Sequence, residues 1–206
     1  MVPTAQVINV PQALRHLRRD AHLAPLIAQH GPPTFRPARS AFRALTESIV
    51  YQQLSGKAAA AIFEHFLDIF PGRRFPTPEQ LMGVPVPRLR AAGLSSQKAA
   101  YLLDLAARFH DGTIAPRRFR KMTDEEISDH LIQVKGIGQW TADMFLMFAL
   151  NRPDVLPVGD LGIRNGFKKL YNLSEPPTAE QMEVLAEAWR PHRTVASWYL
   201  WRVVGD

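Results

Sequence analysis

Cysteine is absent from this sequence of 206 residues. Its absence excludes disulfides, thiolate zinc sites and cysteine-ligated iron–sulfur clusters, and it is typical of proteins from a reducing compartment. Long apolar runs are also lacking, since no stretch approaches the roughly 20 residues that a membrane-spanning helix needs, and the N-terminal segment lacks the apolar centre of a secretory signal. We therefore expect a soluble cytoplasmic protein with no membrane partner.

Metal-site and nucleotide-site motifs are missing as well. The seven histidines are scattered without HxH or HExxH spacing, so we expect no catalytic metal. Neither GxGxxG nor GxxxxGK[ST] occurs, so a nucleotide cofactor is not expected. The chemistry of such a chain must come from its side chains and from water.

Positive charge is in excess. Lys and Arg number 25 against 19 Asp and Glu, which gives a net charge of +6. This balance favours a polyanionic partner such as DNA or RNA, although many basic proteins bind neither. With 46% hydrophobic residues, the chain can bury one large core or two smaller ones that share a cleft.

Helical periodicity runs through nearly the whole chain, whereas the alternation typical of strands is scarce. Phe42, Leu45 and Ile49 share one face of a predicted helix behind a Ser40 N-cap, and this face continues to Gln53. Capping boxes at residues 123–126 and 178–181 predict the starts of two further helices. We expect an all-α bundle in two lobes around a cleft, approximately residues 40–135 and residues 1–39 with 136–206.

Two glycines interrupt the helical pattern in VKGIGQWTADMF, residues 134–145. Gly136 and Gly138 allow a sharp reversal at positive φ, which predicts a helix–hairpin–helix motif. The N–H groups of such a turn and of the next helix start can hold a phosphate. Taken alone, Gly-X-Gly between two helices is more often only a turn.

Four blocks of the sequence, in order, resemble the helix–hairpin–helix DNA glycosylase superfamily, most closely its 3-methyladenine DNA glycosylase II branch of the AlkA type. The blocks are FRALTESIVYQQLSGKAAAAI, GLSSQKAAYLLDLA, LIQVKGIGQWTADMFLMFAL and LPVGDLGIRNG. The chain departs from the family at Lys135, where the hairpin usually has proline. It also has no room for the N-terminal β-rich domain of the enterobacterial-type enzyme.

The resemblance implies a DNA glycosylase of base excision repair, which flips a damaged nucleotide out of double-stranded DNA and hydrolyses its base to leave an abasic site. Alkylated purines are the implied substrates, 3-methyladenine and 7-methylguanine first, with ethenoadenine or hypoxanthine as wider scope. The reaction needs no cofactor, and we expect a monomer. Two other hypotheses are a glycosylase for oxidised or mispaired bases and a non-catalytic helix–hairpin–helix DNA-binding module.

Asp160, in GDLGIR, falls at the family's catalytic carboxylate. A carboxylate there stabilises the positive charge that develops on the deoxyribose, or it orients and deprotonates the attacking water. The sequence leaves both roles open, and an aspartate at a helix start is most often an ordinary N-cap.

Trp140 stands where strand-nicking relatives carry a lysine nucleophile, which implies a monofunctional enzyme without lyase activity. Tryptophan also suits a cationic alkylated purine. The resemblance adds Trp201 to the base pocket, and Met144 and Tyr51 are further candidates. The alternative role for Trp201, and for its neighbour Trp198, is core packing of the last helix.

The DNA-binding residues implied by the resemblance form three groups. The intercalating wedge is Gln53, with Leu54 as the alternative. The backbone anchor comprises the hairpin and nearby groups, namely Lys135, Gly136, Ile137, Gly138, Thr141 and Lys57. A structural Na⁺ or K⁺ is implied at the carbonyl oxygens of Ile132, Val134 and Ile137.

Overall fold

The computed structural model describes residues 7–205, and within that range all regular secondary structure is helical, with no strand. The predicted all-α class is confirmed. Two compact units divide the chain, Ala38–Ala142 and Met1–Pro37 with Asp143–Asp206. We refer to the first as the hairpin unit and to the second as the aspartate unit. No helix among residues 7–205 is long and apolar enough to cross a membrane.

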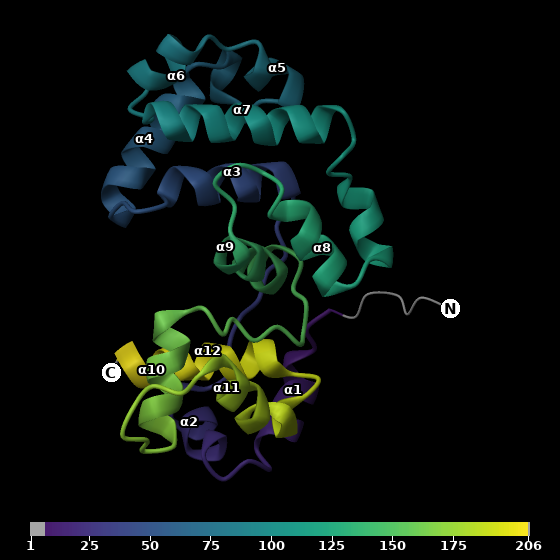
Figure 1. Cartoon of the computed structure of the whole chain (residues 1–206), viewed down its shortest axis with the longest axis vertical. Coiled ribbons are helices and arrows are strands. Elements are labelled where there is room, and N and C mark those ends of the chain that lie inside the picture. Colours follow the sequence, from purple (N-terminus) through teal and green to yellow (C-terminus); the bar gives the residue numbers. More distant parts are fainter. Residues whose placement is uncertain (1–6, 206) are drawn as a thin grey trace. The chain divides into compact units, whose positions relative to one another are not determined.

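The hairpin unit is built on the long helix α7, which lies beside α3 and packs against α5 and α6 (Figure 1). Its core includes the fully buried side chains of Leu45, Ile49, Phe66 and Leu102. The elements are α3 (Ala41–Tyr51), α4 (Gly56–Asp68), η1 (Pro71–Arg73), α5 (Pro78–Met82), α6 (Val86–Ala91), α7 (Ser96–His110), η2 (Pro116–Lys121), α8 (Asp124–Leu131) and α9 (Gln139–Met144), the last of which crosses the unit boundary.

The aspartate unit packs α10 and α2 against the C-terminal helix α12 (Figure 1). Trp189, Tyr199 and Phe167 are the largest fully buried side chains of its core. The elements are α1 (Val10–Leu17), α2 (Leu23–His30), the π-helical turn η3 (Phe145–Ala149), α10 (Leu161–Leu170), α11 (Ala179–Leu185), η4 (Glu187–Trp189) and α12 (Arg193–Gly205).

Local sequence signals place several helix starts. Both predicted capping boxes form, with Thr123 and Glu126 closing the start of α8 and Thr178 and Gln181 that of α11. Ser40 caps α3 by accepting a hydrogen bond from the N–H of Arg43 at 3.3 Å. These pairs lie three residues apart, so the sequence alone is enough to specify them.

The unit boundary at Ala142 falls later than the sequence-based division at residue 135. Residues 136–142, which include the hairpin turn, therefore pack with α3 and α7 and belong to the hairpin unit. Two hydrogen bonds hold the turn there, one at Gly136 and one at Lys135 just before it. The side chain of Gln52 donates to the carbonyl of Gly136, and the carboxylate of Asp104 accepts from the N–H of Lys135.

Candidate active site and DNA-binding surface

The hairpin turn lies between α8 and α9 and depends on one glycine in particular. Gly136 has φ 82°, and a Cβ at this position would overlap the ring of Tyr101. Gly138, by contrast, has no positive φ and no neighbouring atom within 4 Å of a Cβ built on it. The prediction of positive φ at both glycines is wrong for Gly138, whose open surroundings instead leave its backbone accessible to a ligand.

Two N–H groups of the predicted anchor are already engaged within the protein. That of Lys135 donates to Oδ2 of Asp104 at 2.9 Å, and that of Ile137 donates to the carbonyl of Val134 at 3.0 Å. Ile137 and Thr141 are both 4% exposed, and Thr141 lines the pocket described below. The anchor as a whole stays a prediction. Its accessible parts are the backbone at Gly138 and the exposed side chains of Lys135 and Lys57.

The predicted wedge lies in a turn rather than on a helix. Helix α3 ends at Tyr51, Gln52 is extended with φ −53° and ψ 133°, and Gln53 has φ 56°. Gln53 therefore does not continue the buried face of α3, which corrects the periodicity argument. Leu54 is 40% exposed and does not return to the core. Both wedge candidates remain at the surface of the hairpin unit.

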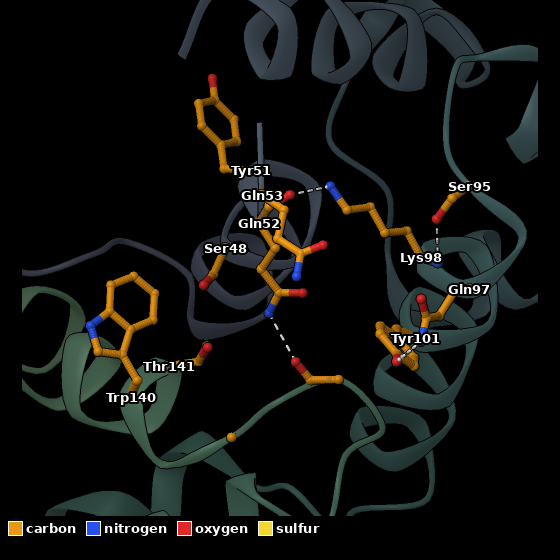
Figure 2. Close-up of a pocket in the computed structure, with 12 residues that line it drawn as sticks. Ser48, Tyr51, Gln52, Gln53, Ser95, Gln97, Lys98, Tyr101, Trp140 and Thr141 are labelled. Carbon is orange, nitrogen blue, oxygen red and sulfur yellow. Dashed lines mark hydrogen bonds between the residues drawn. The ribbon is translucent and has the colours of Figure 1, made fainter. Parts of the chain in front are cut away.

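The turn at residues 52–54 is called the wedge turn below. A pocket of about 600 Å³ joins the wedge turn to the hairpin turn within the hairpin unit. Figure 2 shows Tyr51 and Trp140 on one side of it and Lys98 and Tyr101 on the other. Tyr51 and Trp140 are 40% and 47% exposed, so their rings offer aromatic surface to a ligand. The lining residues are Ser48, Tyr51, Gln52, Gln53, Ser95, Gln97, Lys98, Tyr101, Gly136, Gly138, Trp140 and Thr141.

Asp160 is the N-cap of α10 in the aspartate unit, and its carboxylate has a second partner. Oδ1 accepts a hydrogen bond from the N–H of Ile163 at 2.8 Å and another from the indole N–H of Trp201 at 2.9 Å. The first is the ordinary capping bond that the sequence predicts. The second comes from a residue 41 positions away. Together the two donors fix the orientation of this half-buried carboxylate.

Trp201 belongs to an aromatic row beside Asp160. Its ring centroid lies 5.9 Å from that of Phe148, which lies 6.0 Å from that of Phe35 in a stacked arrangement. Trp201 is partly buried against the core of the aspartate unit and also bonds to Asp160, so its place in the base pocket stays a prediction. Trp198 packs against the same core and carries the guanidinium of Arg202 on its face, 4.3 Å from the ring centroid.

Sequence reasoning missed Phe148 and Phe35. Phe148 is 41% exposed in the π-helical turn that follows α9. Met144, a predicted pocket residue, is partly buried at the end of α9. The four-residue spacing from Met144 to Phe148 was a usable helical signal. Phe35 lies outside regular secondary structure, and no periodic pattern marks it.

Gly162 leaves room for the Trp201 bond. A Cβ at residue 162 would lie 2.8 Å from Cδ1 of Trp201 and 3.0 Å from Oδ1 of Asp160. We expect Gly162→Ala to displace the indole and to lower the activity that depends on Asp160 by about tenfold, as for the loss of a hydrogen bond to a charged group. The measurement is the single-turnover rate, with thermal unfolding to confirm the fold.

Gly205→Ala is the matched control for this substitution, because a Cβ at Gly205 meets nothing within 4 Å. Its rate should equal that of the wild type. A Gly162→Ala rate that also equals the wild type would show that the Trp201–Asp160 contact has no part in the reaction.

Comparison with known proteins places this geometry in a family. The model of the HhH-GPD superfamily, described as base excision DNA repair protein, matches residues 46–191. DNA-3-methyladenine glycosylase 1 of Schizosaccharomyces pombe is 37% identical over 181 residues, which cover 87% of this chain and 79% of that protein. A putative DNA-3-methyladenine glycosylase of Bacillus subtilis, YfjP, is 30% identical over 201 residues, which cover 95% of this chain and 70% of that protein.

Solved structures agree with these matches. The S. pombe 3-methyladenine DNA glycosylase Mag1, in complex with abasic DNA, superposes with a TM-score of 0.78 at 37% identity and covers 93% of this chain and 95% of that one. The DNA-3-methyladenine glycosidase of Bacillus halodurans superposes with a TM-score of 0.86 at 35% identity. The match covers 98% of this chain and 92% of that one.

Proposed function

Because the chain belongs to the HhH-GPD superfamily of base excision DNA repair proteins, we propose that it is a monofunctional DNA glycosylase that hydrolyses alkylated purines from double-stranded DNA. The observation that carries the proposal is the Asp160 carboxylate, held by Ile163 and Trp201 beside an aromatic row. The relatives named DNA-3-methyladenine glycosylase support 3-methyladenine as a substrate. We add 7-methylguanine, ethenoadenine and hypoxanthine as further substrates.

Asp160 acts on the sugar. Breaking the bond between base and deoxyribose leaves positive charge on the sugar, and a fixed carboxylate nearby stabilises that charge without reorganising during the reaction. The same carboxylate can orient and deprotonate the attacking water. Either role requires that the carboxylate point in one direction, which the two N–H donors to Oδ1 ensure.

The nucleophile is water because the position of the family's lysine is taken by Trp140, which has no amine for a Schiff base. Lys135 lies five residues earlier, in the turn before α9, and does not replace it. Hydrolysis therefore ends at an abasic site with both strands intact. No cofactor enters this reaction.

The substrate preference follows from charge and aromatic surface. Alkylation at N3 or N7 makes a purine cationic, which weakens its bond to the sugar and attracts it to the faces of aromatic rings. Exposed or partly exposed rings occur in both units, Tyr51 and Trp140 in the hairpin unit and Trp201 and Phe148 in the aspartate unit. Met144 adds a polarisable side chain.

The hairpin unit supplies the contacts to the DNA backbone. The open backbone at Gly138, the start of α9 and the side chains of Lys135 and Lys57 suit contacts to phosphate, which position a protein without reading sequence. Gln53, or Leu54 beside it, fills the space that the flipped nucleotide leaves. The protein acts as a monomer on cellular DNA.

A structural cation completes the proposed anchor. The carbonyl of Ile132 lies just past the end of α8, where carbonyls lack an intrahelical partner. That of Val134 shares the turn with Ile137, whose N–H it accepts. Carbonyl oxygens are the donors that a hard cation prefers, so these three residues fit Na⁺ or K⁺, which would offset phosphate charge without entering the reaction.

The test is a duplex that contains a single alkylated purine. We expect the wild-type protein to release the free base, to leave a strand that breaks only after alkali or heat, and to form no covalent adduct with DNA under borohydride. Trapping by borohydride would contradict the monofunctional assignment. Release of an oxidised or mispaired base in its place would support a glycosylase of another branch, and DNA binding with no release of any base would support the non-catalytic module.

A further inference from the structure

Lys98 makes contacts that the reaction described above does not use. It lies in the first turn of α7, and its partly buried ammonium donates hydrogen bonds of 2.7 Å to the carbonyls of Val50 and Gln52. These carbonyls belong to the end of α3, almost 50 residues earlier in the chain. Carbonyls at the end of a helix lack intrahelical donors, and a cation is the favoured partner there.

The two bonds hold the backbone where α3 gives way to the wedge turn. Gln52 leaves the helix as an extended residue, and Gln53 follows with φ 56°, a conformation that residues other than glycine adopt rarely. Without an outside donor, the Gln52 carbonyl would need another partner and the turn could relax. The ammonium thus stabilises the backbone that presents Gln53.

The same turn is tied to the hairpin. The side chain of Gln52 donates to the carbonyl of Gly136 at 2.8 Å, while the carbonyl of Gln52 accepts from the ammonium of Lys98. Lys98, Gln52 and Gly136 therefore form a continuous chain of hydrogen bonds that joins α7, the wedge turn and the hairpin turn. All of its members lie in the hairpin unit.

Lys98 is not placed as a phosphate ligand. Two of its three N–H donors serve protein carbonyls, and burial lowers the pKa of its ammonium below the ordinary value for lysine because water is partly removed from the charge. An exposed lysine that meets phosphate keeps its hydration until DNA arrives. Lys57, which is exposed beside the same turn, is the contrasting case.

We propose that Lys98 is a positioning residue of the wedge, which holds the turn at Gln52 and Gln53 in register with the hairpin so that Gln53 enters the duplex without reorganisation. This inference rests on the proposed glycosylase function and on Gln53 as the wedge. Lys98 touches no substrate and acts only through the turn. Its contribution is therefore confined to substrates whose damaged base must be extruded from a paired helix.

The test compares one alkylated purine in a fully paired duplex with the same purine in an unpaired bubble. In the bubble the base is already unstacked, so the wedge is not needed. We expect Lys98→Met to slow single-turnover base release from the paired duplex by about tenfold, as for the loss of a hydrogen bond to a charged donor, and to leave release from the bubble unchanged. Equal losses on both substrates would overturn the proposal, since they would indicate a general structural defect.

Three further variants sharpen this result. Gln53→Ala should slow release from the paired duplex by a similar factor. On that duplex the double variant with Lys98→Met should be no slower than the slower single variant, because both changes remove one function. Lys98→Arg should recover part of the rate, since arginine can still donate to both carbonyls. Additive losses in the double variant would overturn the proposal.

Salt dependence separates positioning from phosphate binding. Lys57→Met should reduce the slope of log Kd against log salt concentration by about one, as for one lost phosphate contact, whereas Lys98→Met should not change it. A reduced slope for Lys98→Met would overturn the proposal. Failure of the glycosylase assignment is distinguishable, because the wild-type protein would then release no base from either substrate.

Discussion

Replacing Asp160 by Asn should nearly abolish base release. The substitution keeps the size of the side chain and an oxygen that can accept from Ile163 and Trp201, but it removes the negative charge. We expect the single-turnover rate on a duplex with one 3-methyladenine or 7-methylguanine to fall by at least about 10²-fold, the scale seen when a group that stabilises transition-state charge is lost. Free base is measured by chromatography.

Binding gives the control for this result. The affinity of Asp160→Asn for abasic-site DNA should stay close to that of the wild type, because the proposed phosphate contacts lie in the hairpin unit. Loss of both release and binding would point to a folding defect, which thermal unfolding would reveal. Release that continued at the wild-type rate would refute the catalytic assignment and leave Asp160 as a helix cap.

Among the substitutions proposed here, Gly136→Ala should cause the largest loss of stability. Alanine at φ 82° is strained by about 1 kcal/mol, and the added methyl group would overlap the Tyr101 ring. Overpacking of this kind adds about 1–3 kcal/mol. We expect the free energy of unfolding of the hairpin unit to fall by about 2–4 kcal/mol in total, measured by denaturant titration, with a parallel loss of DNA affinity.

Two variants separate the causes of that loss. Gly138→Ala introduces no contact within 4 Å and no positive φ, so it should leave the unfolding free energy almost unchanged and lower only the affinity for DNA. Tyr101→Ala combined with Gly136→Ala should remove the destabilisation that comes from overlap with the Tyr101 ring. The destabilisation that comes from backbone strain at residue 136 should remain. Equal unfolding free energies for wild type and Gly136→Ala would show that the turn does not have the geometry described.

The helix starts show how far local signals reach. The sequence predicts Thr123 and Thr178 as caps from capping boxes and Ser40 as a cap from its place before an apolar period, and each forms its bond. The end of α3 was not predictable in this way. The apolar period continues to Gln53, but the helix stops at Tyr51, where the carbonyl of Gln52 meets the ammonium of Lys98, 46 residues later.

The candidate site divides along the same line. Part of it can be predicted from the sequence, because a turn glycine and a capping aspartate each express a constraint within a few neighbouring residues. The role of the tryptophan in place of lysine comes from the family resemblance. The orientation of the Asp160 carboxylate cannot be predicted from the sequence. Its indole partner is 41 residues away, and Phe35 joins Trp201 and Phe148 from a segment without periodic structure.

The sequence by itself determined that the chain is helical, that a glycine turn lies between α8 and α9, and that a carboxylate begins α10. These features depend on backbone sterics and on hydrogen bonds that span a single turn. Only the tertiary structure decided where the wedge turn begins, which N–H groups of the hairpin are already used, and what holds Asp160 in place. Those outcomes depend on side chains such as Lys98, Asp104 and Trp201, whose partners are distant in the chain and are chosen by packing.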